Sequence, residues 1–363
     1  MFEQVEVRNL RNLEHVELLF DYTTNVVCGD NGQGKTSLLE AVYLAATSRS
    51  FRTHRLREIV RHGSEAAIVR ARVHDSLGPR EHLVAISPNQ RVVKVDDQRP
   101  ESIAAFAVRT PVVVFHPGEL TLTMGPAAMR RTLLDRVALF VDPSGHAAGQ
   151  AHKQAMRARQ RLLQTSTGTS RALEAYEHVM AEQGALWTRR RREAADLLLR
   201  AARAAFERMA PAGTSLAIRY EPSGGEDASA IRRRLATARE ADRRRASACV
   251  GPHRDELVFE LDGRLARTEA SQGQHRLLTL SLKIAEMDCI RAVRGMNPLL
   301  LLDDVSSELD ASRNEAFFEL LGTRRDQVFL TTTRPEMLPV FEQKLGGAKV
   351  FELRAGQVVW TRG

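Results

Sequence analysis

A glycine-rich segment near the N-terminus constrains the fold of this chain more than any other feature. Residues Gly29–Thr36 read GDNGQGKT and match the pattern G-x-x-x-x-G-K-[ST] at every fixed position. An apolar run, Asn25–Cys28, precedes the segment, and a helical pattern, Ser37–Ala46, follows it. This context is typical of a loop whose glycines let backbone N–H groups converge on phosphates at the N-terminus of a helix. The segment therefore predicts an α/β fold with a phosphate-binding loop.

The residues of this loop have expected roles at a bound nucleotide. Lys35 is expected to reach the β- and γ-phosphates, and the Thr36 hydroxyl is expected to hold Mg²⁺. ATP and Mg²⁺ are thus the expected cofactors. The predicted nucleotide contacts in this region are Gly29, Asp30, Asn31, Gly32, Gln33, Gly34, Lys35, Thr36 and Ser37.

Four leucines followed by two aspartates, at Leu299–Asp304, form the second element. A continuous apolar run predicts a strand buried on both faces of a parallel sheet, and ligands bind at the carboxyl ends of such strands. Asp303 is expected to join Thr36 in the Mg²⁺ site, and Asp304 is expected to orient the attacking water. An apolar run that ends in acidic residues is weak evidence alone. The presence of the phosphate-binding loop in the same chain makes this interpretation strong. Together the two elements predict Lys35, Asp303 and Asp304 as catalytic residues.

A polar tetrapeptide, SQGQ, precedes the predicted long helix Arg276–Val293. It is similar to the S-G-G-Q signature of ABC ATPases, in which the signature of one subunit contacts the γ-phosphate bound to the other. On that likeness Ser271 is also a catalytic candidate. Alone, such a tetrapeptide would indicate a helix cap. The nucleotide contacts that it adds are Ser271, Gln272, Gly273 and Gln274.

Two further segments lie downstream in the order that ABC ATPases have. Ser307–Asp310 resembles the D-loop that follows the acidic strand. Thr331–Thr333 stands where that class usually carries a switch histidine. This departure puts any histidine-dependent step in doubt and indicates slow hydrolysis. No glutamine is identified for the loop that senses Mg²⁺ in that class.

The chain divides into three expected parts. Residues 1–116 and 250–363 show strand and helix patterns in alternation. Residues 117–249 read as mainly helical instead. The sequence therefore predicts an ATPase head, split in sequence, with an inserted helical lobe.

The expected insert has its own internal order. Ala151–Leu163 and Arg171–Met209 are rich in Ala, Leu, Glu and Arg, which favour helices. Thr165–Ser170 is predicted to be the turn between them, and Glu221–Ser229 is predicted to be an exposed loop.

The positive charge of the chain lies in this middle region. The net charge is +8, and residues 151–250 hold 20 Lys or Arg against 11 Asp or Glu. Arginine clusters favour bidentate contacts to phosphates, so DNA is an expected partner. A solvated helical face is the alternative reading. The predicted DNA contacts are Arg189, Arg190, Arg191, Arg192, Arg232, Arg233 and Arg234, and a third cluster spans Arg243–Arg245.

Composition excludes several classes of protein. No run of 18 or more apolar residues exists, so we expect no transmembrane helix and no membrane partner. The first residues lack the charged-then-apolar shape of a signal peptide. Cys28, Cys249 and Cys289 are scattered and odd in number, which indicates a reducing cytoplasm and no structural zinc.

Taken together, these segments resemble the RecF family over nearly the whole chain. GPHRD, SQGQ and the paired aspartates before SELD are the narrowest parts of the likeness, and Gly118-Glu119 departs from the Pro-Glu that the family often has. The stretches that carry it are EVRNLRN at Glu6–Asn12, GDNGQGKTSLLEAVYL from Gly29, SRSFRTHR at 48–55, VVVFHPGELTLTMGPAAMRRTLLD at Val112–Asp135, GPHRDEL at 251–257, SQGQHRLLTLSLKIAE at 271–286 and LLLLDDVSSELD at 299–310.

The resemblance implies an α/β head of the ABC/SMC type without a long coiled coil. It implies a weak, DNA-stimulated ATPase that dimerises around ATP, binds double-stranded and gapped DNA, and helps RecO and RecR to load RecA. Arg11 and Asn12 become nucleotide contacts by the same likeness. Arg52 and Arg55 are weaker candidates for the same role, and ordinary surface arginines is the preferred reading of them. The chemistry of His253 and Arg254 stays open.

Other classes of protein share some of these elements. An ABC transporter subunit has the same ATP elements, but it normally lacks a basic helical insertion of this size. An SMC-type head with a structural role needs a coiled coil of many heptads, for which the chain has no room. A nuclease of the overcoming-lysogenisation type needs a further metal-binding domain after the head. A small kinase or GTPase has no use for SQGQ.

Overall fold

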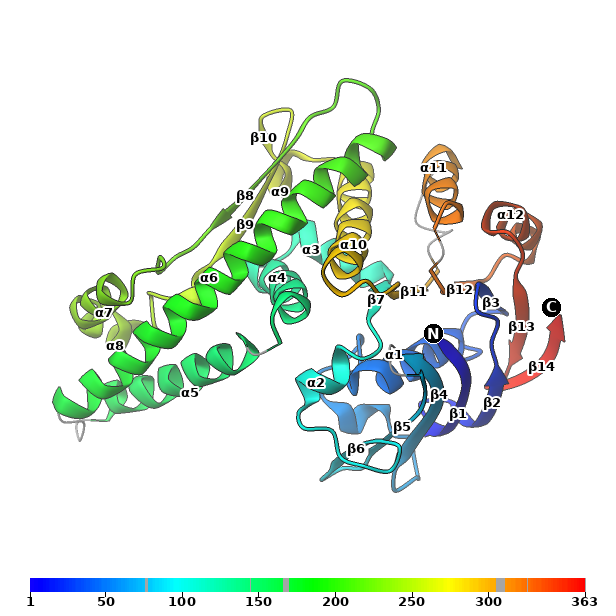
Figure 1. Ribbon diagram of the computed structural model, residues 1–363, viewed down its shortest axis with the longest axis horizontal. Helices are drawn as coiled ribbons and strands as arrows, with labels where there is room; N and C mark the ends of the chain where they lie inside the picture. The colour runs from blue at the N-terminus through cyan, green and yellow to red at the C-terminus, as the bar shows by residue number, and fades with distance from the viewer. Residues whose placement is uncertain (76–77, 144, 166–169, 305–310, 325, 363) are drawn as a thin grey trace. The chain divides into compact units, whose positions relative to one another are not determined.

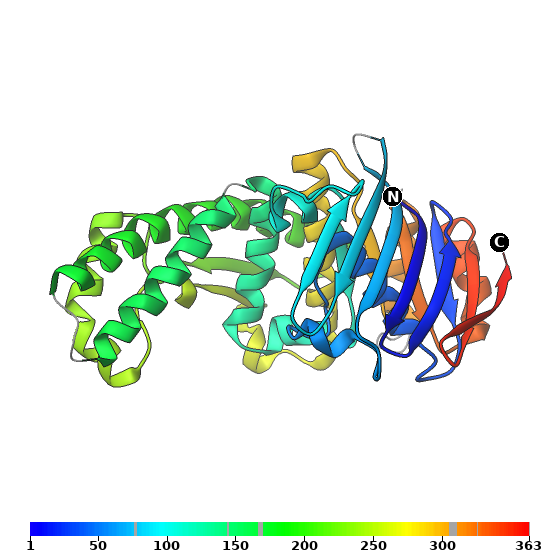
Figure 2. The same cartoon turned by 90° about the horizontal axis from the view of Figure 1, so that it is seen from below.

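The chain folds into two compact units, residues Met1–Glu119 with Ile290–Gly363, and residues Leu120–Cys289. The structure is a computed structural model that describes residues 1–75, 78–143, 145–165, 170–304, 311–324 and 326–362, with side chains left out at 170 and 311–315. Figures 1 and 2 show that the first unit is α/β and the second mainly helical.

A six-stranded sheet in the order β14-β13-β3-β12-β11-β7 forms one layer of the first unit. The strands from β13 to β7 pair in parallel, and β14 pairs antiparallel with β13. Every residue of β3, β7, β11 and β12 is buried, which explains their continuous apolar or small side chains. The bounds are β3 Thr24–Cys28, β7 Val112–Phe115, β11 Leu299–Leu302, β12 Val328–Thr332, β13 Lys349–Arg354 and β14 Gln357–Arg362.

A second, antiparallel sheet has the order β2-β1-β4-β5-β6. Helix α1 (Lys35–Thr47) packs on β4 and β5 of this sheet and on β7 and β12 of the other. Because both of its faces are covered, α1 is apolar nearly all round, and it joins both sheets into one hydrophobic core. The strands are β1 Phe2–Leu10, β2 Leu13–Leu19, β4 Ala67–Asp75, β5 Gly78–Ile86 and β6 Arg91–Val95.

Shorter helices complete the first unit. Figure 1 labels α2, α11 and α12 among them. Their bounds are η1 Leu56–Ile59, α2 Ile103–Ala107, α11 Ala311–Gly322, η5 Pro335–Met337 and α12 Leu338–Leu345, while η2 Pro117–Leu120 ends the segment after β7.

The second unit is built around a long helical hairpin. Helix α6 (Ser170–Met209) has 40 residues, a length of about 60 Å, and it packs on α5 (Gly145–Gln164) along the hairpin. A three-stranded sheet, β10-β9-β8, lies in the same unit. The remaining elements are α3 Thr121–Met124, α4 Ala127–Val141, β8 Leu216–Glu221, α7 Ala228–Thr237, α8 Arg239–Arg245, η3 Pro252–Arg254, β9 Glu256–Leu261, β10 Arg264–Leu265, α9 Ala266–Glu269 and α10 Gln272–Arg294.

A buried ion-pair network ties this unit together. Arg159 on α5 is 1% exposed and contacts the carboxylates of Glu177 on α6, at 3.0 Å, and Asp242 on α8, at 2.6 Å. Buried charges are tolerated only when paired in this way, so the network fixes how α5, α6 and α8 pack.

Parts of the predicted order are confirmed and parts are wrong. Ala151–Leu163 and Arg171–Met209 lie within α5 and α6. Strand β8, with its alternating side chains, lies inside the region that was expected to be mainly helical. The Glu221–Ser229 segment does lead from β8 to α7, but Gly224 within it is buried. Most of the predicted turn at Thr165–Ser170 lies outside the described residues.

The second unit extends to Cys289 and so takes in residues that the sequence analysis grouped with the C-terminal part of the head. The functional division at 116 and 249 stays a prediction. No helix among the described residues is both long and apolar enough to cross a membrane.

Candidate functional site

The carboxyl ends of the parallel strands in the first unit meet at one edge of the sheet. Strand β3 leads into the loop before α1, β11 leads into Asp303 and Asp304, and β12 ends at Thr332. The pairing aligns Cys28 with Thr332 and Leu302 with Leu330, so these ends are level. The predicted loop and acidic strand are therefore brought together.

Glycines are required where the loop turns. Gly29 has a φ of 144°, and a Cβ there would come within 2.4 Å of the Leu353 carbonyl oxygen on β13. Gly34 caps α1 with a φ of 109°, and a Cβ there would lie 2.8 Å from Leu13 Cδ2. Any other residue would strain the backbone or push back the neighbouring strands. Both positions match the fixed glycines of the sequence pattern.

Lys35 reaches back over the loop. Its Nζ donates hydrogen bonds to the carbonyl oxygens of Gly29 at 2.7 Å and Asp30 at 2.8 Å. Burial lowers the pKa of Lys35, an effect that the nearby carboxylates of Asp304 and Asp303 oppose. The amine is thus held as a point charge inside the ring of loop atoms, where phosphates would lie.

Asp303 joins three segments. Its Oδ1 accepts hydrogen bonds from the hydroxyls of Thr36, at 2.9 Å, and Thr331, at 2.8 Å. Thr331 Oγ1 in turn accepts from the backbone N–H of Asp304 at 2.9 Å, where the chain turns with a φ of 52°. The hydroxyl and carboxylate oxygens assembled here are the ligand types that Mg²⁺ prefers.

Asn12 and Arg11 come from the turn between β1 and β2. Asn12 donates to the Gly32 carbonyl at 3.0 Å and accepts from the Ser37 hydroxyl at 2.9 Å, so it braces both sides of the loop. Arg11 instead makes a two-point ion pair with Glu40 of α1, with both distances 2.9 Å. Its guanidinium is committed to positioning α1, although Arg11 still lines the site.

Glu40 was missed by the sequence analysis. This carboxylate is fully buried. It forms ion pairs with Arg11 and Arg52 and accepts a hydrogen bond from the Ser50 hydroxyl. The sequence does carry a signal for this residue. Glu40 is a charged residue in the apolar middle of a predicted helix, and arginine-containing segments lie on both sides of it in the chain, so a buried ion pair could have been expected. Arg52, read from the sequence as an ordinary surface arginine, therefore has a specific partner at 3.4 Å.

An open cavity of about 520 Å³ lies over this edge of the sheet. It combines cations, hydroxyls and carboxylates, as a site for a phosphate and a divalent metal requires. The lining residues are Arg11, Asn12, Asn31, Gly32, Gly34, Lys35, Thr36, Ser37, Arg52, Asp303, Asp304, Thr331 and Thr333.

Comparison with known proteins decides the family. Residues 1–352 match the sequence model of the RecF/RecN/SMC N terminal domain. The DNA replication and repair protein RecF of Anaeromyxobacter sp. (strain Fw109-5) is 40% identical over 337 residues, which cover 90% of each chain. The chain belongs to the RecF family. The RecF of Myxococcus xanthus (strain DK1622) is 37% identical, with 91% of this chain and 90% of the relative covered.

Solved structures support the same family and fold. The recombination mediator protein RecF-ATP in the RecFOR pathway is 26% identical, covers 100% of this chain and 97% of its own, and superposes with a TM-score of 0.88. The Smc head domain from Pyrococcus furiosus, with an extended coiled coil, superposes with a TM-score of 0.60 at 15% identity, which is a likeness of fold. The predicted α/β head of the ABC/SMC type is confirmed.

A departure from the RecF family pattern has a structural reason. His116 follows β7, level with Asp303 after β11, and its Nδ1 accepts from the Gly118 N–H at 3.1 Å. A Cβ on Gly118 would lie 2.6 Å from His116 Cε1, so the glycine makes room for the imidazole. Glu119 Oε1 is 3.7 Å from His116 Nε2. The sequence analysis assigned neither His116 nor Glu119 a role.

The signature residues lie in the second unit, at the start of α10. Ser271 Oγ accepts from the Gln274 N–H at 3.3 Å, and Gln274 Oε1 accepts from the Ser271 N–H at 2.8 Å. This is a capping box, so the alternative reading of a helix cap is present in the structure. Ser271 and Gln272 are exposed, while Gly273 and Gln274 are half-buried. Action on a nucleotide in a second subunit stays a prediction, and the predicted D-loop, Ser307–Asp310, lies outside the described residues.

The Arg189–Arg192 cluster is mostly engaged within the protein. Arg191 is 1% exposed, lies 2.8 Å from Asp135 and 2.9 Å from Asp255, and stacks over Trp187. It was predicted to contact DNA, and its burial removes it from any DNA surface. Its neighbours Arg190 and Arg192 form ion pairs, and Arg189 donates to a backbone carbonyl.

The second predicted cluster, Arg232–Arg234, makes fewer contacts within the described part of the protein than the first. Arg232 and Arg233 on α7 are exposed and have no partner among the described residues, whereas Arg234 donates to the Ser223 carbonyl at 2.8 Å. Arg157 and Arg161, exposed one turn apart on α5, were not singled out from the sequence. Their i, i+4 spacing was the signal that would have found them.

Proposed function

We propose that this chain is an ATP-dependent DNA-binding protein of recombinational repair and DNA replication. The observation that carries the proposal is the joint placement of Lys35, Thr36 and Asp303 at one sheet edge, under an open cavity. Membership of a family whose relatives are described as DNA replication and repair proteins supports the DNA-directed part. The structural neighbour described with ATP supports the nucleotide.

The donor set fits Mg²⁺. Thr36 Oγ1 and Asp303 Oδ1 are 2.9 Å apart, a hydroxyl and a carboxylate that could share one cation with phosphate oxygens. When bound, Mg²⁺ would supply positive charge that favours the developing charge on the phosphates. The protein's own part is to hold both oxygens in place, through Thr331 and the backbone of α1.

The protein residues have distinct parts in hydrolysis. Lys35 neutralises the terminal phosphates and holds them against the loop amides. Asp304 orients a water for attack, with its backbone fixed by Thr331. Because a threonine stands where related ATPases usually place a histidine, we propose that hydrolysis is weak. From the family resemblance we further propose that DNA stimulates it.

ATP would act by closing a dimer. In this proposal Ser271 and Gly273 of one subunit meet the γ-phosphate held by the other, which makes two equivalent sites in an isologous pair. Their exposed or half-buried state at the start of α10 leaves them accessible to a second subunit. The dimer on gapped or double-stranded DNA would then work with RecO and RecR to promote RecA loading.

DNA contact is proposed for the arginines of the second unit that lack internal partners. Arg232 and Arg233 carry this part, with Arg157 and Arg161 as further candidates. Exposed guanidiniums without carboxylate partners are the groups that can release counterions from a phosphate backbone. Arg189, Arg190, Arg192 and Arg234 are retained as weaker contacts, because each already has a partner.

Gel filtration with and without ATP and Mg²⁺ tests the proposal, repeated with a gapped duplex present. We expect a monomer alone, a dimer with ATP and Mg²⁺, and a larger complex with DNA. The Lys35→Ala variant is the matched control and should stay monomeric. If the elution volume of the wild type is the same with and without ATP, both in the absence and in the presence of DNA, the dimer mechanism is contradicted.

A further inference from the structure

Glu40 is a buried carboxylate beside the candidate nucleotide site, and the hydrolysis proposed above gives it no part. Its two oxygens accept hydrogen bonds from Arg11, Arg52 and the Ser50 hydroxyl. Both arginines line the nucleotide cavity, whereas Glu40 does not. A fully buried carboxylate is tolerated only when it is paired. Glu40 therefore connects two cations of the cavity wall to the interior of the first unit.

The two arginines are held by Glu40 to different degrees. Arg11 makes the two-point ion pair at 2.9 Å, and its Nη1 also donates to the Glu58 carbonyl at 2.9 Å. Arg52 makes a single contact to Glu40 at 3.4 Å, and its side chain is 40% exposed. No other partner of the Arg52 guanidinium is found among the described residues. Arg11 is thus fixed in place, while Arg52 keeps donors for a ligand in the cavity that it lines.

Glu40 also holds the backbone of Arg52, through Ser50. The Ser50 hydroxyl donates its proton to Glu40 Oε1. The same oxygen accepts from the backbone N–H of Arg52 at 3.0 Å and of Thr53 at 3.1 Å. A hydroxyl has one proton and two lone pairs, so all of its bonding capacity is used here. The carboxylate that contacts the Arg52 guanidinium therefore also sets where this side chain leaves the backbone.

We propose that Glu40 is a positioning residue for ATP binding, which holds Arg52 at the nucleotide cavity so that its free guanidinium donors meet phosphate oxygens. The planar fork of arginine suits such oxygens. A cation that is already placed loses less conformational freedom when the ligand binds, which favours affinity. Because Arg11 keeps the buried carboxylate paired, Arg52 can turn to a phosphate without leaving Glu40 as an isolated charge.

Net charge alone would give the opposite effect. Glu40→Gln removes a negative charge close to the site of a polyphosphate, which by Coulomb attraction would strengthen ATP binding. The positioning role requires weaker binding instead. The glutamine amide has one oxygen that accepts and one NH₂ that only donates, so it cannot hold both arginines and Ser50. The sign of the change therefore separates the two effects.

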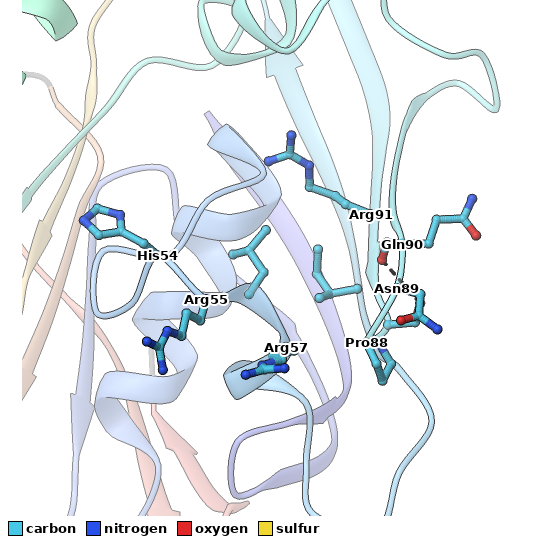
Figure 3. Close-up of a pocket in the computed structure, with 10 residues that line it drawn as sticks. His54, Arg55, Arg57, Pro88, Asn89, Gln90 and Arg91 are labelled. Atoms are coloured by element: carbon cyan, nitrogen blue, oxygen red, sulfur yellow. Dashed lines mark hydrogen bonds between the residues drawn. The ribbon is translucent and has the colours of Figure 1, made fainter. Parts of the chain in front are cut away.

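Arg55, on the same segment as Arg52, offers a matched control. Figure 3 shows Arg55 among the residues that line a separate open cavity of about 490 Å³. This cavity shares no lining residue with the nucleotide cavity. Arg55 is 74% exposed, so water screens its charge. A direct phosphate contact is thus expected of Arg52 and not of Arg55.

This inference rests on the proposed ATP binding. The test is calorimetric titration of ATP in Mg²⁺ into the full chain, with circular dichroism to check that each variant is folded. The variants are Glu40→Gln, Arg52→Gln and the double variant. The controls are Arg55→Gln and Glu177→Gln, which removes a buried carboxylate paired with two arginines in the second unit.

We expect Glu40→Gln and Arg52→Gln each to bind ATP about tenfold more weakly than the wild type, the size of one charge-assisted hydrogen bond. The double variant should also be weakened about tenfold, and not about a hundredfold, because both substitutions remove the same contact. Both controls should bind ATP as the wild type does.

Four results would overturn a stated claim. Wild-type or tighter binding by Glu40→Gln refutes the positioning role, and additive losses in the double variant show that Glu40 does not act through Arg52. An equal loss in Arg55→Gln makes the effect one of charge alone. A wild type that does not bind ATP refutes the proposed function itself. If Glu40→Gln does not fold, Arg52→Gln decides, since it leaves Glu40 paired with Arg11, and wild-type affinity in that variant refutes the inference.

Discussion

The hydroxyl of Thr36 donates a hydrogen bond of 2.9 Å to the carboxylate of Asp303, which lies 267 residues further along the chain. The two residues follow β3 and β11, which lie on either side of β12 in the parallel sheet. Thr331 at the end of β12 donates to the same carboxylate oxygen. Three distant segments thus meet at one carboxylate, and this meeting point explains how the chain could hold a metal and a nucleotide together.

Substitutions of Asp303 and Asp304 should have different effects on ATP binding and hydrolysis. Asp303→Asn should weaken ATP binding in Mg²⁺ but not in EDTA, because it removes the negative charge that would hold the cation beside the Thr36 hydroxyl. Asp304→Asn should keep ATP bound and slow hydrolysis by about 10²–10⁴-fold, the usual size of an acid–base contribution. Nucleotide binding and phosphate release, measured on both variants, separate the roles. Equal hydrolysis rates in Asp304→Asn and the wild type would remove Asp304 from the mechanism.

The α7 arginines should matter for DNA alone. Arg232→Gln/Arg233→Gln should lower the salt slope of duplex binding by about 1 to 2 without changing the free energy of unfolding, since both side chains are exposed and unpartnered. The comparison variant is Arg191→Gln, which strands Asp135 and Asp255 and should cost about 3–5 kcal/mol of stability. An unchanged slope in the double variant would mark α7 as a solvated face.

The second unit should lose stability in acid through His152. This imidazole is fully buried, with Nδ1 donating to the Met180 carbonyl at 2.9 Å. Burial lowers the pKa of His152 to about 4, helped by the charges of His253 and Arg191. The neutral ring therefore favours the folded state fully above pH ~6.5, and this contribution declines as pH falls toward 4.

The expected loss between pH 7 and pH 5 is about 2 kcal/mol, from about 1.4 kcal/mol per pH unit below 6.5. Urea unfolding followed by the fluorescence of Trp187, whose ring lies 5.8 Å from His152, measures it. His152→Gln should flatten the pH dependence, whereas His178→Gln, an exposed histidine on α6, should leave it intact. The same pH dependence in all three proteins would refute the assignment to His152.

Ser271 can be tested without disturbing its helix cap. Asp and Asn both cap helices about as well as Ser, so Ser271→Asp and Ser271→Asn should both keep α10 stable. Only the aspartate would repel a γ-phosphate. We expect Ser271→Asp to bind ATP as a monomer and fail to dimerise, while Ser271→Asn dimerises at least in part. If light scattering shows both variants dimerising with ATP as the wild type does, Ser271 is a cap and nothing more.

Short sequence motifs were enough to predict much of the fold and of the candidate site. The glycines at 29 and 34, Lys35 and the leucine run before Asp303 are short motifs whose backbone needs are encoded in adjacent residues, so their places could be predicted. Strand β8 was missed because its six alternating residues follow the 40-residue helix α6, and its partner β9 comes more than 30 residues later in the chain.

Partnerships across the fold were beyond the reach of sequence patterns. Arg191 looks the same as Arg190 in a run of arginines, and only the packing of α4, α6 and the segment before β9 shows that it is buried between Asp135 and Asp255. The same holds for Arg11, whose partner Glu40 lies 29 residues away. Charge patterns located a basic region, and burial decided which of its cations are free.

Binding of ATP to Lys35→Ala tests the central claim most directly. Calorimetric titration of ATP in Mg²⁺ should give clear binding to the wild type and to the surface control Lys94→Ala. The Lys35→Ala variant should bind at least tenfold more weakly, because the loop then lacks the charge that Lys35 holds against Gly29 and Asp30. Wild-type affinity in Lys35→Ala would contradict the assignment of this loop as the nucleotide site.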